Sequence, residues 1–280
     1  WWRAMFWLAA APAAAQCLLL ALVPESPRWL RRAGKVAEAE RAEAALWGAA
    51  GDGGAKAGGG DEEGGEGGGW GELLSGAYSK ALVVGPCMFI FQQLSGINAV
   101  VFFSSAVFRQ AGVANDLLAS VAVSATNMVG TVVAGGLLDR AGRRPLLTGS
   151  FLGMGASMAL LALALSQPWL KAYAPALALL GTMSYIFSFG MGVGPVPALL
   201  CAEIFPQRVR GSAMSLGMGL HWGFNIAIGQ LFLSATEAFG VPAVYAFFAA
   251  VCAAGAAFTR RLVVETKGRE MDEIAAAYAS

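Results

Sequence analysis

Seven long apolar runs constrain the fold of this chain more than any other feature of its sequence. They cover residues of approximately 4–23, 81–108, 117–138, 145–166, 173–202, 212–235 and 241–264. Each run is about as long as the roughly 20 apolar residues that an α-helix needs to cross a bilayer. Hydrophobic residues make up 57% of the chain and charged residues only 13%, which is unlike a soluble domain. The sequence therefore predicts an all-α membrane protein with about seven transmembrane helices.

The positions of lysine and arginine predict the orientation of these helices. Connections rich in these residues stay in the cytosol. Of the 19 lysines and arginines, all but Arg3, Arg109 and Lys171 follow the first, third, fifth or last run. Those connections should therefore face the cytosol, and the start of the chain should lie on the opposite side.

Four regions follow from this pattern. Residues 1–24 should form a transmembrane helix, 25–79 a cytosolic helical connection, 80–264 a six-helix half, and 265–280 a cytosolic tail. Within the connection, residues 48–69 contain twelve glycines and five acidic residues. Such a composition buries too little apolar surface to offset the entropy of ordering, so we expect a disordered linker there.

The connection should begin with two short helices. Ser26 and Pro27 suit an N-cap and a first helical position, and Gly34 should end the helix that they start. A second polar helix is expected over Val36–Trp47, before Gly48.

Composition also excludes several functions. A formal net charge of +1 gives no basic surface for phosphates, so we expect no nucleic-acid partner. One histidine and no Cys-x-x-Cys spacing argue against a metal site, and the four cysteines fit small apolar residues within the runs. We expect no cofactor and no enzymatic activity, and the sequence leaves the oligomeric state open.

Three amides lie close together in the second run. Gln92, Gln93 and Asn98 are expensive at membrane depth, where such groups either bond between helices or line a path for polar solutes. On a straight helix they would point at about 0, 100 and 240 degrees, so they would not converge. A break at Ser95 and Gly96 would let them do so, as discontinuous helices do in transporters.

A second break is expected in the fifth run. Gly194, Pro195 and Pro197 lie in its middle, in the run GMGVGPVPA, and the prolines remove donors and clash with preceding carbonyls. The helix should bend or unwind there, either as a static kink or as a gate.

Other polar and aromatic residues lie within the runs. Asn127 is in the middle of the third, and Trp222 and Asn225 lie three apart in the sixth. A tryptophan can stack on a sugar ring while amides hold its hydroxyls, although packing is its commoner role. For His221, next to it, packing is the favoured interpretation.

Charged residues recur at the cytosolic ends. The groups are DRAGRR over 139–144, EIFPQRVRG over 203–211, and Glu265 in the tail. Each places a carboxylate near a guanidinium, which suits bidentate pairing between helix ends, although solvated anchors are the alternative. No Asp or Glu falls in the middle of a run, so no proton relay can be located.

Several motifs together resemble a known family. VPESPRWL at 23–30, QQLSGIN at 92–98, DRAGRR, EIFP and VETKGR at 264–269 resemble, in order and spacing, the sugar porters of the major facilitator superfamily. GPVPALL, SLGMGLHW and residues 70–78 resemble most the plastidic glucose transporters of plants and algae.

The resemblance implies a fold and a mechanism. The fold would be a twelve-helix bundle of two halves, with the sugar held at the midplane and alternating access between the halves. This chain would supply helices six to twelve, an incomplete bundle that we expect not to transport by itself, as a fragment of a longer protein.

The resemblance also assigns roles to residues. The substrate-binding residues would be Gln92, Gln93, Asn98, Asn127, Trp222 and Asn225. The gate would be formed by Phe102, Phe103, Gly194, Pro195 and Pro197. The intracellular charge latch would comprise Asp139, Arg140, Arg143, Arg144, Glu203, Arg210 and Glu265. Three departures from the family pattern are the two phenylalanines in place of tyrosines, Ala198 in place of tryptophan, and Val264 in place of proline.

The function expected from these features is facilitative transport of a hexose, glucose first. The alternatives are a proton-coupled sugar symporter and a transport-incompetent sugar sensor or partner-binding membrane protein. The partners would be the hexose and the lipid bilayer. We expect the plastid inner envelope, with the plasma or vacuolar membrane as alternatives.

Overall fold

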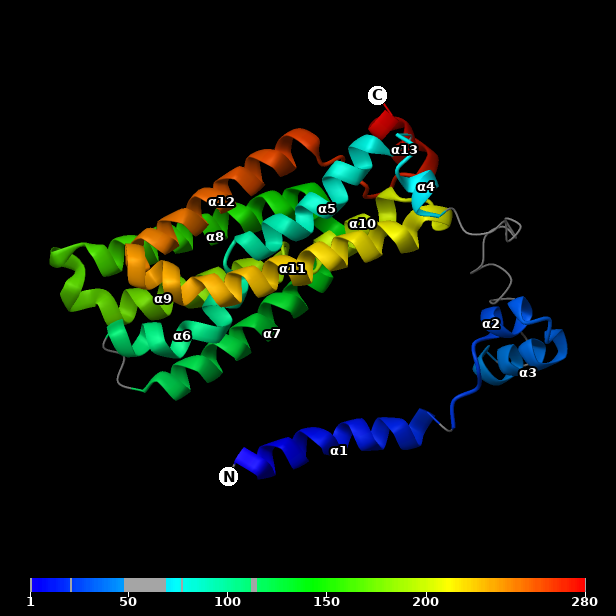
Figure 1. Cartoon of the computed structure of the whole chain (residues 1–280), viewed down its shortest axis with the longest axis horizontal. Helices are drawn as coiled ribbons and strands as arrows, with labels where there is room; N and C mark the ends of the chain where they lie inside the picture. The colour runs from blue at the N-terminus through cyan, green and yellow to red at the C-terminus, as the bar shows by residue number, and fades with distance from the viewer. Residues whose placement is uncertain (1, 21, 48–68, 77, 112–114, 280) are drawn as a thin grey trace. The chain divides into compact units, whose positions relative to one another are not determined.

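The computed structural model describes residues 2–20, 22–47, 69–76, 78–111 and 115–279. The chain divides into two compact units, Trp1–Gly65 and Glu66–Ser280, and the described elements of both are helices (Figure 1). The boundary falls within the glycine-rich stretch. Except for Gly69, the linker predicted there lies outside the described residues.

The first unit contains α1 (Trp2–Leu20), α2 (Pro27–Arg32) and α3 (Val36–Trp47). The two short helices were predicted, and they pack on each other through Leu30 and Ala39, which are buried. Arg31 pairs with Glu43 across them at 2.7 Å. Gly34 ends the first of them with a φ of 76°, where only glycine is unstrained. The expected side-chain cap is absent, since the hydroxyl of Ser26 accepts from no backbone N–H of the helix; the N–H of Ser26 itself donates to Glu25.

The second unit is a helical bundle. Its elements are α4 (Trp70–Leu73), α5 (Ser79–Leu94), α6 (Ile97–Ala111), α7 (Asp116–Ala141), α8 (Arg143–Ser166), the 3₁₀-helix η1 (Pro168–Tyr173), α9 (Ala174–Met191), α10 (Val196–Ile204), α11 (Gln207–Phe239), α12 (Val241–Leu262) and α13 (Met271–Ala279). α8 packs against both α12 and α9, α7 packs on α9, and α5 packs on α11. Large side chains fill the core, among them Phe89, Phe151 and Tyr185.

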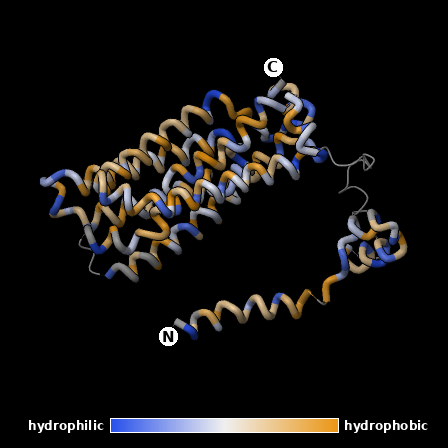
Figure 2. The backbone as a smooth tube through the Cα atoms, in the orientation of Figure 1, coloured by the Kyte–Doolittle hydropathy of each residue, from blue (hydrophilic) through white to orange (hydrophobic). Residues whose placement is uncertain are grey.

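Hydropathy along the bundle fits a membrane protein. In Figure 2 the helices of this unit are mainly orange to white, with much of the blue at helix ends. Within the described residues, five segments are long and apolar enough to cross a membrane. They are Ser79–Ser105, Val121–Leu138, Arg143–Ser166, Pro168–Ile204 and Val241–Leu262.

Two of the seven expected spans are not among these five segments, one because of its length and the other because of its hydropathy. The apolar part of α1, Phe6–Leu20, is shorter than a full span. α11 has 33 residues but is not among the five segments, because polar residues such as His221, Asn225 and Gln230 dilute its hydropathy. Both segments are nevertheless helical, as the sequence predicts.

Both predicted helix breaks are present. α5 ends at Leu94 and α6 begins at Ile97, and Gly96 between them has a φ of 93°. A Cβ at Gly96 would lie 2.6 Å from the ring of Phe248, so both the backbone conformation and the close packing require glycine. The second break separates α9 from α10 over residues 192–195.

Candidate functional site

Gln92 connects the two helix breaks. Its Nε2 donates to the carbonyl oxygens of Val193 at 2.7 Å and Gly194 at 2.9 Å, in the turn between α9 and α10. These carbonyls have lost helical partners, and in a bilayer an unsatisfied backbone group costs several kcal/mol. The side chain of Gln92 is buried, so the amide acts as the missing helical donor.

Tyr185 provides a second connection in the opposite direction. From α9, its hydroxyl donates to the carbonyl of Ser95 at 3.0 Å, at the break between α5 and α6. Ser95 in turn donates from its hydroxyl to the carbonyl of Gln92 at 2.7 Å. Each break therefore has a freed carbonyl that accepts from a side chain on the other broken helix.

Ser150 of α8 stabilises the second break from the other side. Its hydroxyl donates to the carbonyl of Ser188 at 2.6 Å and accepts from the N–H of Val193 at 3.0 Å. The unwound turn after α9 is thus bonded by side chains from two other helices.

His221 lies at the centre of the amides. Gln93 Nε2 is 2.9 Å from His221 Nδ1 and 2.8 Å from its Nε2, and Gln92 Oε1 is 3.0 Å from Nδ1. Asn98 donates from Nδ2 to Gln93 Oε1. The three amides thus converge, but through the histidine. Packing alone, which the sequence favoured, is the wrong description of His221.

The cluster is buried on one side and accessible on the other. Gln93 is only 1% exposed, whereas Asn98, His221 and Asn225 are half-buried. Trp222 is 60% exposed, and its ring lies edge-on to His221 with centroids 5.2 Å apart. A ligand arriving from the exposed side would meet Asn98, His221 and Trp222 before the glutamines.

Asn127 is the predicted binding residue that the structure keeps apart. It lies on α7, and its exposed side chain makes no hydrogen bond among the described residues. Its backbone carbonyl instead faces Gly190 of α9, where an added Cβ would lie 3.3 Å away. The side chain of Asn225, on α11, likewise makes no hydrogen bond within the described residues.

The predicted gate residues differ in their surroundings. Phe103 stacks on Phe232 of α11, with centroids 4.6 Å apart and planes at 19°. Phe102 is 59% exposed. Gly194 and Pro195 form the end of the unwound turn, and Pro197 lies in the first turn of α10. Phe103 therefore packs against α11, whereas Phe102 is largely accessible.

At the opposite end of the bundle, Arg143 and Glu203 form the predicted bidentate pair. Arg143 Nη2 is 2.7 Å from Glu203 Oε1, and its Nε is 3.1 Å from both carboxylate oxygens. Thr266 of the tail donates its hydroxyl to the same carboxylate at 2.6 Å. The pair connects α8, α10 and the tail.

Glu265 bonds to backbone rather than to arginine side chains. Its carboxylate accepts from the N–H groups of Arg143 at 2.8 Å and Arg144 at 3.0 Å, at the start of α8, and from those of Thr266 and Lys267. Burial raises the pKa of Glu265, but the four backbone N–H groups lower it, and the net pKa lies below the ordinary value. Glu265 therefore caps α8 from the tail, with its charge near the positive helix end.

The other predicted latch residues bond differently. Arg144 donates to the carbonyl of Arg260, and Lys267 donates to that of Arg140 at 2.7 Å. Arg210 donates to the carbonyl of Phe205 at 3.1 Å. The side chain of Asp139 lies outside what the structure describes.

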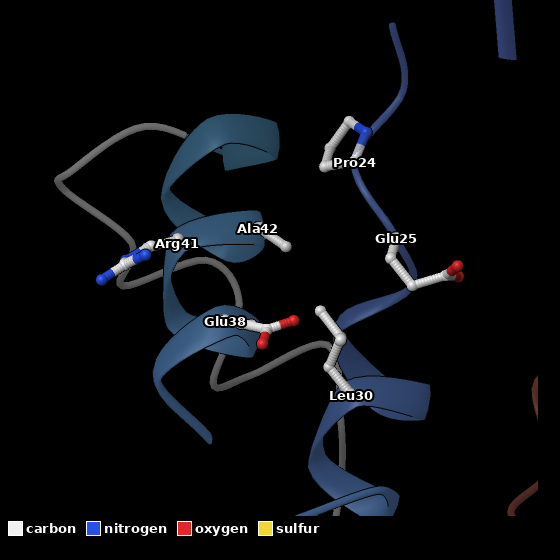
Figure 3. Close-up of a pocket in the computed structure, with 6 residues that line it drawn as sticks. All are labelled: Pro24, Glu25, Leu30, Glu38, Arg41 and Ala42. Atoms are coloured by element: carbon white, nitrogen blue, oxygen red, sulfur yellow. The ribbon is translucent and has the colours of Figure 1, made fainter. Parts of the chain in front are cut away.

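One surface hollow of about 300 Å³ lies in the first unit (Figure 3). Its lining is Pro24, Glu25, Leu30, Glu38, Arg41 and Ala42. The figure shows Glu38 and Ala42 of α3 opposite Leu30 of α2, with Glu25 directed away. Lys35 pairs with Glu38 beside it at 3.3 Å. No group of three metal-ligating side chains occurs anywhere in the described residues.

Sequence reasoning missed three of these contributors. They are His221 as the bridging group, and Tyr185 and Ser150 at the breaks. The signal for His221 was present, because a polar side chain in an apolar run costs as much as an amide does. Tyr185 and Ser150 gave no such signal, because a tyrosine or a serine is unremarkable in a membrane helix.

Broken helices with buried amides beside the breaks are typical of membrane transport proteins, and the sequence comparison identifies the family of this chain. Residues 1–278 match the model of the family described as "Sugar (and other) transporter". The chain belongs to this family, which consists of transporters rather than enzymes.

Individual relatives and solved structures agree with this assignment. The chain is 46% identical to plastidic glucose transporter 4 of Arabidopsis thaliana, over 100% of this chain and 52% of the relative. It is 41% identical to probable plastidic glucose transporter 2 of the same plant, over 98% of this chain and 56% of the relative. The solved proton:xylose symporter XylE of the major facilitator superfamily, bound to 6-bromo-6-deoxy-D-glucose, aligns with a TM-score of 0.75 and 30% identity, over 99% of this chain and 59% of that one.

The chain therefore has a partial major facilitator superfamily fold. It spans about half the length of the curated relatives that it matches.

Proposed function

We propose that this chain forms the carboxy-terminal wall of the substrate site in a facilitative hexose transporter, with glucose as the substrate. The relatives named as plastidic glucose transporters support this choice of sugar. In this proposal the sugar binds at the midplane, and the two halves of the bundle alternate access to it.

One observation carries the proposal. Gln92, Gln93, Asn98 and His221 form a continuous hydrogen-bonded chain beside two helix breaks. Such a chain within an apolar bundle is expensive unless it contacts a polar solute, and a sugar offers hydroxyls that both donate and accept. Trp222 presents an exposed ring next to it, which suits stacking on a pyranose. We include Asn127 and Asn225 in the site as residues that complete it when the halves close.

A chimera tests this function. The chain replaces the matching part of the Arabidopsis plastidic glucose transporter 4, which supplies the remaining length, and uptake of labelled D-glucose is measured in yeast that lack hexose uptake. We expect saturable uptake by the chimera. Gln93→Leu and Asn98→Ala should each raise the KM by about tenfold, because a buried hydrogen bond to a polar ligand is worth about 1–3 kcal/mol.

The matched control is Gln167→Ala. Gln167 is a half-buried glutamine between α8 and η1 whose side chain bonds, within the described residues, only to the adjacent Ser166, so uptake by this variant should match that of the parent chimera. If the parent transports glucose and both site variants keep its KM, the assignment of the site is wrong. If the parent is expressed at the membrane and takes up no hexose, the proposed substrate is wrong.

Proton-coupled symport is the second candidate, because the solved XylE is a proton:xylose symporter. No carboxylate of this chain lies in the middle of a predicted span, which favours facilitated transport. Glucose uptake by the chimera should therefore survive a protonophore, and collapse of uptake would favour symport.

The remaining roles belong to the same proposal. The charged helix ends act as an intracellular latch, Phe102 and Phe103 with the turn at Gly194, Pro195 and Pro197 act as gates, and residues 25–79 and 265–280 lie in the cytosol or its plastid equivalent. The plastid envelope is the proposed membrane, on the strength of the relatives' names. Imaging of a fluorescent fusion in plant cells tests it, and labelling of the plasma or vacuolar membrane alone would contradict it.

A further inference from the structure

The chain contains a single histidine, and the structure places it between the two glutamines of the proposed sugar site. No other side chain in the hydrogen-bonded chain of amides can change its charge near neutral pH. Its protonation state therefore decides which atoms of the cluster donate and which accept.

The hydrogen-bond partners of His221 determine which of its two ring nitrogens carries the proton. Gln92 must direct its Oε1 toward His221, because its Nε2 already donates to Val193 and Gly194. The proton of a neutral imidazole then lies on Nδ1, which donates to Gln92 Oε1. The other nitrogen, Nε2, has no proton and accepts from Gln93 Nε2 at 2.8 Å. The neutral Nδ1–H tautomer satisfies these two contacts, and the 2.9 Å approach of the same Gln93 nitrogen to Nδ1 is then a contact between two donors rather than a hydrogen bond.

Protonation would reverse the next two amides. A charged imidazole donates from both nitrogens, so its Nε2–H would meet the NH₂ group of Gln93. Turning the amide of Gln93 would relieve this contact, but would then place its NH₂ group against Asn98 Nδ2, which at present donates to Gln93 Oε1. Asn98 would have to turn as well. The pattern of donors and acceptors presented to a sugar would be inverted.

The ring has apolar rather than charged neighbours. Phe89 of α5 and Trp222 both lie edge-on to it, with centroids at 6.0 and 5.2 Å. On α11 the nearest ionisable residues are Arg210 and Glu237, which at about 1.5 Å per residue lie roughly 16 and 24 Å along the axis.

Ionisable residues also occur on the elements packed against α11, and none of them makes a described hydrogen bond to His221. They are Glu72 on α4, Lys80 and Cys87 on α5, Arg109 on α6, Cys201 and Glu203 on α10, and Tyr245, Cys252, Arg260 and Arg261 on α12. The described hydrogen bonds of His221 all go to amides, so the amides are the groups that respond to its charge.

We propose that His221 is a positioning residue that holds Gln93, and through it Asn98, in the sugar-binding orientation only while it is neutral, so that acidification weakens sugar binding. This inference rests on the proposed function, and it adds a pH-dependent regulation of the same site. The neutral fraction of the ring falls about tenfold for each pH unit below its titration midpoint, which the first test below measures, and the affinity should fall with it.

The first test requires no sugar. ¹⁵N-histidine labelling of the chain, purified without a histidine tag, gives one ring whose nitrogen shifts report tautomer and charge. We expect the Nδ1–H tautomer at pH 7.5. Gln93→Leu removes the donor that favours the neutral ring, so it should raise the titration midpoint by about half a unit or more. An Nε2–H tautomer, or an unchanged midpoint, would overturn the inference.

The second test measures equilibrium binding of labelled D-glucose to the purified chimera from pH 7.5 down to one unit below the midpoint found in the first test. The dissociation constant should rise about tenfold as His221 becomes protonated. His221→Gln can donate and accept without titrating, so it should bind within about threefold of the parent at pH 7.5 and lose most of the pH dependence. His221→Phe should weaken binding about tenfold or more at every pH.

Each outcome of the second test is informative. Binding by the parent that stays constant while the ring titrates, or a pH dependence that persists in His221→Gln, would overturn the inference. If the chimera binds no glucose at any pH, the proposed function fails. The first test still decides whether His221 positions the amides, because it measures the tautomer of the ring and the shift of its titration midpoint in Gln93→Leu without any sugar.

Discussion

Arg143 and Glu203 form a two-nitrogen contact, with Nη2 at 2.7 Å and Nε at 3.1 Å, that connects the start of α8 to the last turn of α10. Their side chains are 15% and 23% exposed, so the contact is largely shielded from water. Thr266 donates to the same carboxylate, so the tail takes part as well.

Replacing Arg143 by lysine should destabilise the bundle. Lysine keeps the charge but cannot form the bidentate contact, and the free energy of unfolding should fall by about 1–3 kcal/mol. Thermal unfolding in detergent measures this loss. The control is Arg208→Lys, because Arg208 is 63% exposed and lies 3.4 Å from Glu72, so its loss should be below about 1 kcal/mol. A double-mutant cycle with Glu203→Gln should give a coupling of about 0.5–3 kcal/mol, and additive effects would contradict the pair.

Glu265→Gln should make stability less dependent on pH. The folded pKa of Glu265 lies below its ordinary value of 4.5, so its charged form contributes stability above that value, and the contribution is lost as pH falls through the folded pKa. The wild type should melt at a higher temperature than the variant at pH 7, and the difference should shrink below pH 4.5. Glu270→Gln is the control, because that exposed side chain makes no hydrogen bond in the described part of the chain. Parallel pH profiles for the wild type and Glu265→Gln would contradict the cap.

Gly96→Ala should destabilise the chain by about 1–3 kcal/mol or more, because the new Cβ would adopt a φ of 93° and would meet the ring of Phe248. Unfolding in a mixed-micelle titration measures the effect. Gly96→Ala should cost less in a Phe248→Ala background than in the wild type, because the clash with the ring is then absent and only the backbone strain remains. Gly149→Ala, in an open position of α8, should be neutral or stabilising. A neutral Gly96→Ala would mean that the break is not held as described.

Tyr185→Phe should destabilise the bundle by about 1–3 kcal/mol, because it leaves the buried carbonyl of Ser95 without its donor. The control is Tyr173→Phe. Tyr173 is 64% exposed, so the loss of its hydroxyl should change the free energy of unfolding by less than about 0.5 kcal/mol. Equal melting temperatures for the two variants would show that the contact between the breaks contributes nothing.

Much of the fold could be predicted because the membrane imposes simple rules. The length of the apolar runs and the glycine at Gly96 predict the helices and the first break, and GMGVGPVPA predicts the second. α11 was also predicted as helical, although its polar residues place it below the hydropathy of the other spans. The helix of residues 36–47 has the predicted bounds, because its caps are local features.

The contacts within the site were harder to predict. Gln92 is 101 residues from Val193 along the chain, and the sequence contains no rule that pairs them. His221 was assigned to packing because its neighbour Trp222 suggested an apolar role. Glu265 was expected to pair with arginine side chains, but a carboxylate beside a helix start can bond the backbone instead, and only the three-dimensional position of the tail decides between the two.

The reciprocal bonds between the two breaks have a consequence for how this protein is made. The carbonyl of Ser95 and the amide of Gln92 are synthesised 90 and 101 residues before their partners in the second broken helix. At about 5–20 residues per second, that interval lasts roughly 5–20 s. Throughout it the first break has bonding groups that lipid cannot satisfy, so the helical pair from Ser79 to Ala111 should complete its insertion only when the second broken helix arrives. The order of synthesis thus makes the second broken helix a requirement for stable insertion of the first.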